Sequence, residues 1–157
     1  MVPKRPEAPT TLDPDLQRRT AADIFNFAWT LLEKPDRSAR EDDLMIHAAH
    51  AQRFHWEWVG DPVNHARGEW QLARVYAVLG RAEPALHHAR RSLELCEANG
   101  IGDFDLAYAY EAMARAYGVT GDGDEAARFE ELARRAAEEI ADADDREQVL
   151  ADLATLP

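Results

Sequence analysis

Cysteine is almost missing from this sequence, in which Cys96 is the single one among 157 residues. A lone thiol cannot form an internal disulfide, and chains that fold without disulfides are typical of reducing compartments. Cys96 lies near the end of an apolar helical stripe, so we expect a small buried hydrophobe and not a reactive thiol.

Long hydrophobic runs are missing as well. The sequence holds no apolar run long enough to cross a bilayer, and its N-terminus lacks the pattern of a secretory signal peptide. These absences predict a cytoplasmic protein that does not act at a membrane.

Positive charge is scarce. With 18 basic and 30 acidic residues, the formal net charge is −12. A general nucleic-acid binder needs a basic face to meet phosphates, so we expect no nucleic-acid partner. Phosphate loops, GxGxxG, nucleophile elbows and HExxH are also lacking. The sequence therefore predicts a non-catalytic protein, not an enzyme, with no cofactor and no metal.

No segment alternates as a strand would, whereas helical periodicity recurs along the chain. Residues 1–11 carry three prolines and predict a flexible tail. Residues 12–157 suffice for one domain with a real core. Helix boundaries are indicated by Asp13-Pro14, by Ser38 with Glu41 and by Gly60-Asp61-Pro62. The predicted helices cover residues 14–33, 39–59, 63–79, 82–98, 103–119, 122–141 and 144–156.

Two stretches of the chain are alike: EWQLARVYAVLGRAEPALHHARRSLEL at 69–95 and YEAMARAYGVTGDGDEAARFEELARRAA at 110–137. When Gly80 is superposed on Gly121, Leu72-Ala73 falls on Met113-Ala114 and Tyr76 on Tyr117. Small residues let two helices approach, and a tyrosine fills the gap between them. Self-similarity of this kind is typical of stacked helical hairpins.

At these residues the chain resembles the tetratricopeptide repeat family of helix–turn–helix repeats. The likeness lies in the large–small–aromatic run and the glycine turn; Gly80 and Gly121 are 41 residues apart, against about 34 in the family. The resemblance implies an all-α fold of stacked antiparallel helical hairpins (a TPR-like α-solenoid), with about seven helices and a C-terminal capping helix. It also implies a helical-repeat scaffold that binds a peptide or protein partner.

In such stacks the first helices of successive hairpins line a concave groove. Arg74 and Arg115 occupy equivalent positions in the two repeats, so their helices should be neighbours, about 8–10 Å apart at the axes. We expect the arginines to bind an anionic or C-terminal group of the partner, and nearby aromatics its apolar part. The candidate site is Arg67, Trp70, Arg74, Tyr108, Glu111 and Arg115. The alternative is that Glu111 pairs with Arg115 or Arg74 and nothing binds.

A second hypothesis concerns helices one to three. Asp43, His47 and His50 lie at spacings of four and three, so one helical side can present them to a divalent ion. With Asn26 and Glu33, His47 and His50 form an alternative small-molecule or metal site, with enzymatic activity as an option. The competing interpretation is that His47 is a hydrogen-bonded core histidine.

The helix predicted at 39–59 has a broad apolar arc, which we expect to face inward: Leu44, His47, Ala48, Ala51, Phe54, His55, Trp58 and Val59. Trp56 lies outside this arc, beside Met45 and Ala49. That second patch either packs on the first helix or serves self-association, which leaves a homo-oligomer open.

Overall fold

The computed structural model describes residues 1–9 and 11–157, so Thr10 of the predicted tail lies outside the described residues. In the described part the protein is all-helical, with seven α-helices and no strand. The helices are α1 (Pro14–Leu32), α2 (Ala39–Val59), α3 (Pro62–Val78), α4 (Ala82–Ala98), α5 (Asp103–Thr120), α6 (Gly123–Glu138) and α7 (Ala143–Leu153). The all-α prediction is confirmed.

Local signals in the sequence place the helix ends. The Asp13 carboxylate accepts hydrogen bonds from the backbone N–H groups of Asp15 and Leu16, both at 3.0 Å. Ser38 and Glu41 form a reciprocal capping box at the start of α2. Gly80 and Gly121 have φ angles of 69° and 84°, which glycine adopts without steric cost. That requirement explains why the two glycines align between the repeats.

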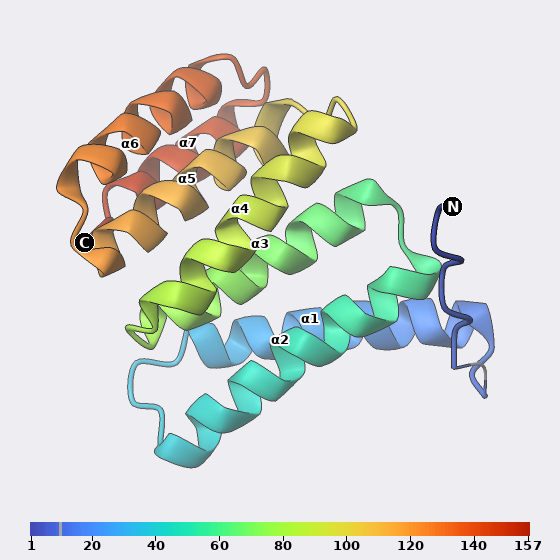
Figure 1. The fold of residues 1–157 in the computed structure, drawn as a ribbon. Coiled ribbons are helices and arrows are strands. Elements are labelled where there is room, and N and C mark those ends of the chain that lie inside the picture. Colours follow the sequence, from blue (N-terminus) through green and yellow to red (C-terminus); the bar gives the residue numbers. More distant parts are fainter. Residues whose placement is uncertain (10) are drawn as a thin grey trace.

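The helices form three antiparallel hairpins, α1–α2, α3–α4 and α5–α6, which stack in chain order (Figure 1). The last helix, α7, packs against both α5 and α6 and so covers the C-terminal end of the stack. Because α3 contacts both α1 and α5, the first helices of the hairpins are neighbours. None of the described helices has the length and hydrophobicity that crossing a bilayer requires.

Small residues set the helix spacing in the core. Ala73, Ala85 and Ala89 are at most 2% exposed, and Tyr76 packs against the same cluster. Between α2 and α3, a Cβ atom on Gly68 would lie 2.9 Å from Cδ of Arg53, too close for an ordinary contact. Glycine therefore lets these two hairpins meet without a shift of the Arg53 side chain.

The predicted inward arc of α2 is wrong for Leu44, His47 and Phe54, which are exposed, whereas Ala48 is buried as predicted. Leu44 and Phe54 are 44% and 50% exposed, whereas the buried residues are Met45, Ala48, Ala49, Gln52 and Trp56. The core face is turned by about one residue, or about 100°, from the prediction. Gln52 donates to the Gly68 carbonyl at 3.2 Å. Together with the alanines on this face, it lets α3 approach α2 more closely than larger side chains would allow. Of the two interpretations of the patch at Trp56, self-association is wrong, because Trp56 is buried in the core.

Candidate ligand groove

A cavity of about 240 Å³ opens where α1, α3 and α5 face one another. These are the first helices of the three hairpins, so the cavity lies on the side where the sequence predicted a groove. Half of its ten lining residues are aromatic: Phe25 and Trp29 from α1, Trp70 from α3, and Phe104 and Tyr108 from α5. The cavity thus joins residues from all three hairpins.

The aromatic rings of the cavity form one continuous row. The centroids of Trp29 and Trp70 are 5.4 Å apart, those of Trp70 and Tyr108 5.2 Å, and those of Phe104 and Tyr108 4.7 Å. All three pairs are tilted or edge-on, the arrangements that ring quadrupoles favour. Each ring supports the next, so the wall is formed before any ligand arrives.

The polar side of the cavity is an Arg67–Asp105 pair. Nε and Nη2 of Arg67 donate to the two carboxylate oxygens of Asp105 at 2.7 and 3.0 Å. The pKa of Arg67 is raised above its ordinary value, first by this hydrogen bond and further by the charges of Asp105, Asp61 and Asp145. Three carboxylates therefore act on one guanidinium, and the electrostatic environment of Arg67 is acidic.

Three of the six predicted site residues, Arg67, Trp70 and Tyr108, line the cavity. The other three form a separate buried cluster. Oε1 of the fully buried Glu111 accepts hydrogen bonds from Arg74 at 3.0 Å and from Arg115 at 2.6 Å. This is the pairing that the sequence left open as the alternative, and it engages both arginines at once.

The Glu111 cluster also reaches α7. Arg115 donates to the Asp152 carbonyl at 3.1 Å and to the Thr155 hydroxyl at 2.8 Å. Tyr108 donates its hydroxyl to the Asp152 carboxylate at 2.6 Å, and burial followed by this bond raises the tyrosine pKa. Arg74, Glu111 and Arg115 therefore fasten α3, α5 and the segment from α7 onward together.

Comparisons of the chain with models of protein families, with curated proteins and with solved structures find no match. Any function must therefore be inferred from the structure itself.

Sequence reasoning missed Phe25, Trp29 and Phe104 as cavity residues. A signal was present, because Phe25 and Trp29 are four residues apart, as are Phe104 and Tyr108, and such pairs share one side of a helix. Two aromatic pairs on first helices of hairpins would have pointed to this cavity.

The alternative site on helices one to three is not assembled in the structure. Asn26, Glu33 and His47 are exposed. His50 Nε2 lies 2.7 Å from the Tyr76 hydroxyl. Burial, and then the charge of His88, lower the His50 pKa. Within residues 1–9 and 11–157, no group of three or more His, Cys, Asp or Glu side chains is placed to hold a metal ion.

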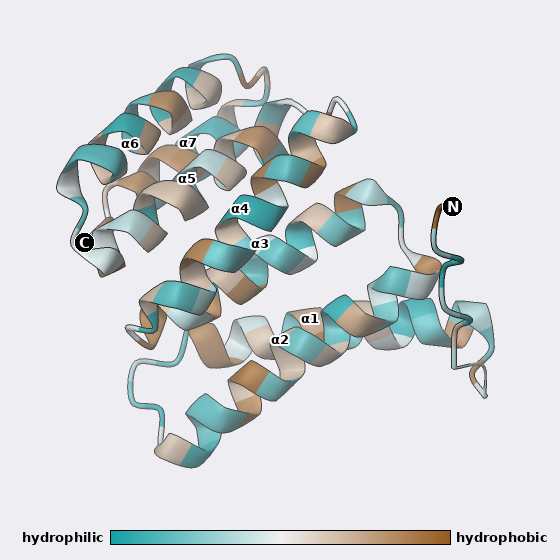
Figure 2. Cartoon of the chain, in the orientation of Figure 1, coloured by the Kyte–Doolittle hydropathy of each residue, from teal (hydrophilic) through white to brown (hydrophobic). Residues whose placement is uncertain are grey.

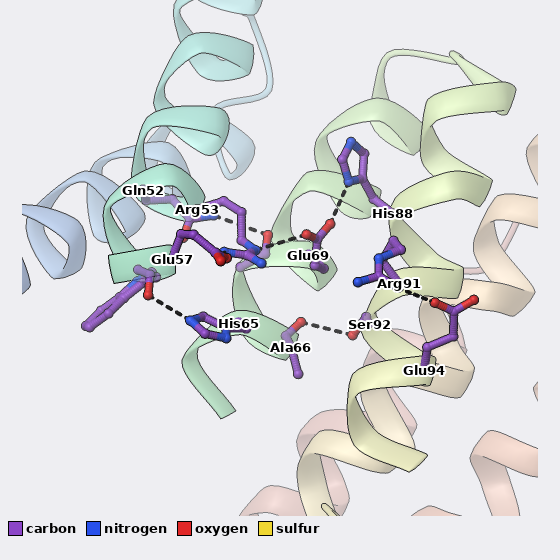
Figure 3. Close-up of polar contacts among 12 residues, drawn as sticks. Gln52, Arg53, Glu57, His65, Ala66, Glu69, His88, Arg91, Ser92 and Glu94 are labelled. Atoms are coloured by element: carbon purple, nitrogen blue, oxygen red, sulfur yellow. Dashed lines mark hydrogen bonds and ion pairs between the residues drawn. The ribbon is translucent and has the colours of Figure 1, made fainter. Parts of the chain in front are cut away.

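A second polar network joins α2, α3 and α4 (Figure 3). Glu69 is at its centre, accepting from Arg53 Nε at 2.9 Å and lying 2.6 Å from His88 Nδ1. Burial acts to raise the Glu69 pKa, but the bonds and charges of His88 and Arg53 outweigh it, and the pKa is lowered. Beside it, Ser92 donates to the Ala66 carbonyl at 3.0 Å. This network ties the first two hairpins together.

Proposed function

We propose that this chain is a non-catalytic, TPR-like helical-repeat protein that binds an extended segment of a peptide or protein partner in its concave groove. One apolar or aromatic side chain of that segment occupies the cavity between α1, α3 and α5. The single observation that carries the proposal is the preformed row of rings from Trp29 to Phe104, which spans all three hairpins.

The size of the cavity favours one side chain over a whole small molecule. Its volume of about 240 Å³ is below the roughly 300–1,000 Å³ usual for small-molecule sites. Burying one large apolar side chain contributes about 1.5–3 kcal/mol. The remaining affinity would come from the rest of the segment along the groove.

The charges beside the cavity favour a basic neighbour for that side chain. Asp105 is paired with Arg67, but Asp61 and Asp145 also act on this arginine. Negative charge is therefore in excess there, and a lysine or arginine of the partner would be attracted to it. The anionic ligand group expected from the sequence is less suitable, because Arg74 and Arg115 already bond Glu111.

The test uses capped hexapeptides with a lysine on each side of one varied central residue. Calorimetry should show that central Trp, Phe or Leu binds at least about tenfold tighter than central Ala, the factor that about 1.4 kcal/mol of burial produces. Replacing the flanking lysines by glutamates should weaken binding.

The chain offers a matched pair of variants for this experiment. Phe25→Ala removes a cavity wall and should abolish the preference for a large central side chain. Val78→Ala shortens another large hydrophobic side chain on a cavity-lining helix, α3, but Val78 is 43% exposed and is not part of the cavity, so this variant should bind as the parent does. Equal binding of all central residues, or an unaltered preference in Phe25→Ala, would show the proposal to be wrong.

A further inference from the structure

Helix α7 lies against α5 and carries both hydrophilic and hydrophobic residues (Figure 2). Its hydrophobic residues Val149 and Leu153 are at most 2% exposed, as a cap over the core requires. Next to them run Asp145, Gln148 and Asp152, whose spacings of three and four place them on one side of the helix. We call these three residues the polar stripe of α7.

Both ends of the polar stripe reach residues of the cavity. Asp152 accepts the hydrogen bond of the Tyr108 hydroxyl at 2.6 Å. The charge of Asp145 contributes to the raised pKa of Arg67. Gln148 lies between them on the same side of the helix, and it lines the cavity itself. Helix α7 is therefore a wall of the groove as well as the cover of the stack.

Most polar side chains of the cavity lining already have a hydrogen-bond partner within the chain. Arg67 and Asp105 bond each other through two atoms on each side. Ser92 donates to the Ala66 carbonyl, and the Tyr108 hydroxyl donates to α7. A ligand in the cavity therefore competes for these groups with bonds that already exist.

Two polar side chains of the lining make no hydrogen bond to another described residue. The indole N–H of Trp70 is buried and lies out of a ligand's reach. Gln148, by contrast, is exposed at the rim of the cavity. Its amide offers a carbonyl oxygen that accepts and an NH₂ group that donates. Gln148 is thus the accessible polar group of the lining that a ligand can bond without displacing a partner.

We propose that Gln148 hydrogen-bonds the main chain of the docked segment and so selects an extended peptide over other apolar ligands. This inference rests on the proposed function, because it concerns a segment whose side chain fills the cavity. Such a segment carries its main chain across the rim, where Gln148 lies. Each main-chain unit has an N–H and a C=O, and one primary amide can bond either or both.

The neighbours of Gln148 in the polar stripe support this assignment. Asp145 and Asp152 are carboxylates, which accept hydrogen bonds and do not donate them. They suit the lysine or arginine expected beside the cavity, but a main-chain carbonyl finds no donor on either. Gln148 is the member of the stripe that can donate to that carbonyl. Main-chain bonds of this kind add affinity whatever the sequence of the segment, while the cavity reads one side chain.

An ester scan of the lysine-flanked hexapeptide with a central Trp tests the inference. Each main-chain amide is replaced in turn by an ester, which removes the N–H and weakens the carbonyl as an acceptor. Calorimetry with the full chain should show about fivefold weaker binding for esters at one or two adjacent positions, the factor for one net hydrogen bond. In Gln148→Met, a side chain of similar length without an amide, the loss at these positions should disappear.

The matched control is Glu147→Met, which places the same new side chain beside Gln148. Glu147 is exposed and is not part of the cavity lining. This variant should show the same ester losses as the parent, whatever the removal of one carboxylate does to the overall affinity for lysines. Circular dichroism should show equal helix content in both variants, because both positions are exposed.

The outcomes separate this inference from the proposed function. If no peptide binds, or if all central residues bind equally, the proposed function is wrong and this inference with it. If the preference for a large central residue is present but ester losses are equal in the parent and Gln148→Met, the role of Gln148 alone is refuted. Losses that Gln148→Met abolishes and Glu147→Met retains would support both.

Discussion

At the C-terminal end of the stack, α7 lies over α5 and α6, whereas α1 and α2 at the N-terminal end have no further helix outside them in the described part of the chain. Leu153 of α7 is 2% exposed, and Leu44 of α2 is 44% exposed. Both leucines belong to apolar stripes with the same helical spacing. They differ in whether a further element covers the stripe. The periodicity of a single helix does not reveal that.

The two ends also differ in the polar groups that fasten them. At the C-terminal end, Glu111 is fully buried between Arg74 and Arg115. At the N-terminal end, the first hairpin is joined by a 3.3 Å contact between Gln17 Nε2 and His55 Nδ1 and by ion pairs nearer the surface, such as that of Lys34 with Glu41, whose side chains are 45% and 29% exposed. A buried charge tolerates the loss of its partner poorly, so the C-terminal end should be the less tolerant of substitution.

The largest effect is expected from Arg115→Ala. It leaves the buried Glu111 carboxylate with one partner fewer, which should lower the free energy of unfolding by about 3–5 kcal/mol. Urea denaturation measures the change. Arg135→Ala is the control, because this arginine is 71% exposed in a surface pair with Glu131, where about 0–1 kcal/mol is expected. Similar losses in both variants would show that the cluster does not fasten the C-terminal end.

A pair of leucines tests the comparison directly. Leu153→Ala should cost about 2–5 kcal/mol by removing a fully packed side chain. Leu44→Ala should change stability by less than about 0.5 kcal/mol, provided that denaturation is measured at a concentration where the chain is monomeric. A large loss from Leu44→Ala in the monomer would mean that the N-terminal end is as closed as the other.

The folding stability is expected to depend on pH through a carboxylate at the N-terminal end. The Lys34 ammonium, followed by the Ser38 backbone N–H, lowers the Glu41 pKa from 4.5 to about 2. Because the folded-state pKa is depressed, Glu41 contributes stability that is present above pH 4.5 and is lost as the pH falls toward 2. Glu41→Gln removes this titration. The stability difference between parent and variant should shrink on acidification, which urea titrations across this range measure; a constant difference would contradict the prediction.

The smallest effect concerns Cys96, which is 1% exposed near the middle of the stack. Burial, followed by the charges of Asp105 and Glu97, raises its pKa to about 11. At neutral pH the thiolate should be about a hundredfold scarcer than in an ordinary cysteine, so a colourimetric thiol reagent should react slowly until urea is added. Rapid labelling of the folded chain would show that the stack opens around α4.

Much of the fold was predictable because its signals are local. The cap at Asp13, the capping box of Ser38 and Glu41, and the glycine turns at 80 and 121 specify where helices begin and end. The repeat also brought Arg67, Trp70 and Tyr108 to one groove. Each of these features depends on residues close in sequence or on the repeat itself.

The rotation of α2 and the pairing of Glu111 were harder to predict from the sequence, for a physical reason. Two stripes of α2 are apolar, and the choice between them depends on Gly68, which lies on another helix and admits Gln52 at close range. Likewise, the state of Arg115 depends on where the Asp152 carbonyl falls. Contacts between distant segments decide the rotation of α2 and the pairing of Arg74 with Glu111, whereas the Glu111–Arg115 pair, four residues apart, is indicated by the sequence.

Helix α1 has a consequence of its own, because one of its sides lines the cavity through Phe25 and Trp29, whereas Ala21 and Ala28 on another side are buried in the core. A tilt or slide of this one helix would therefore change the shape of the cavity and the packing of the first hairpin at the same time.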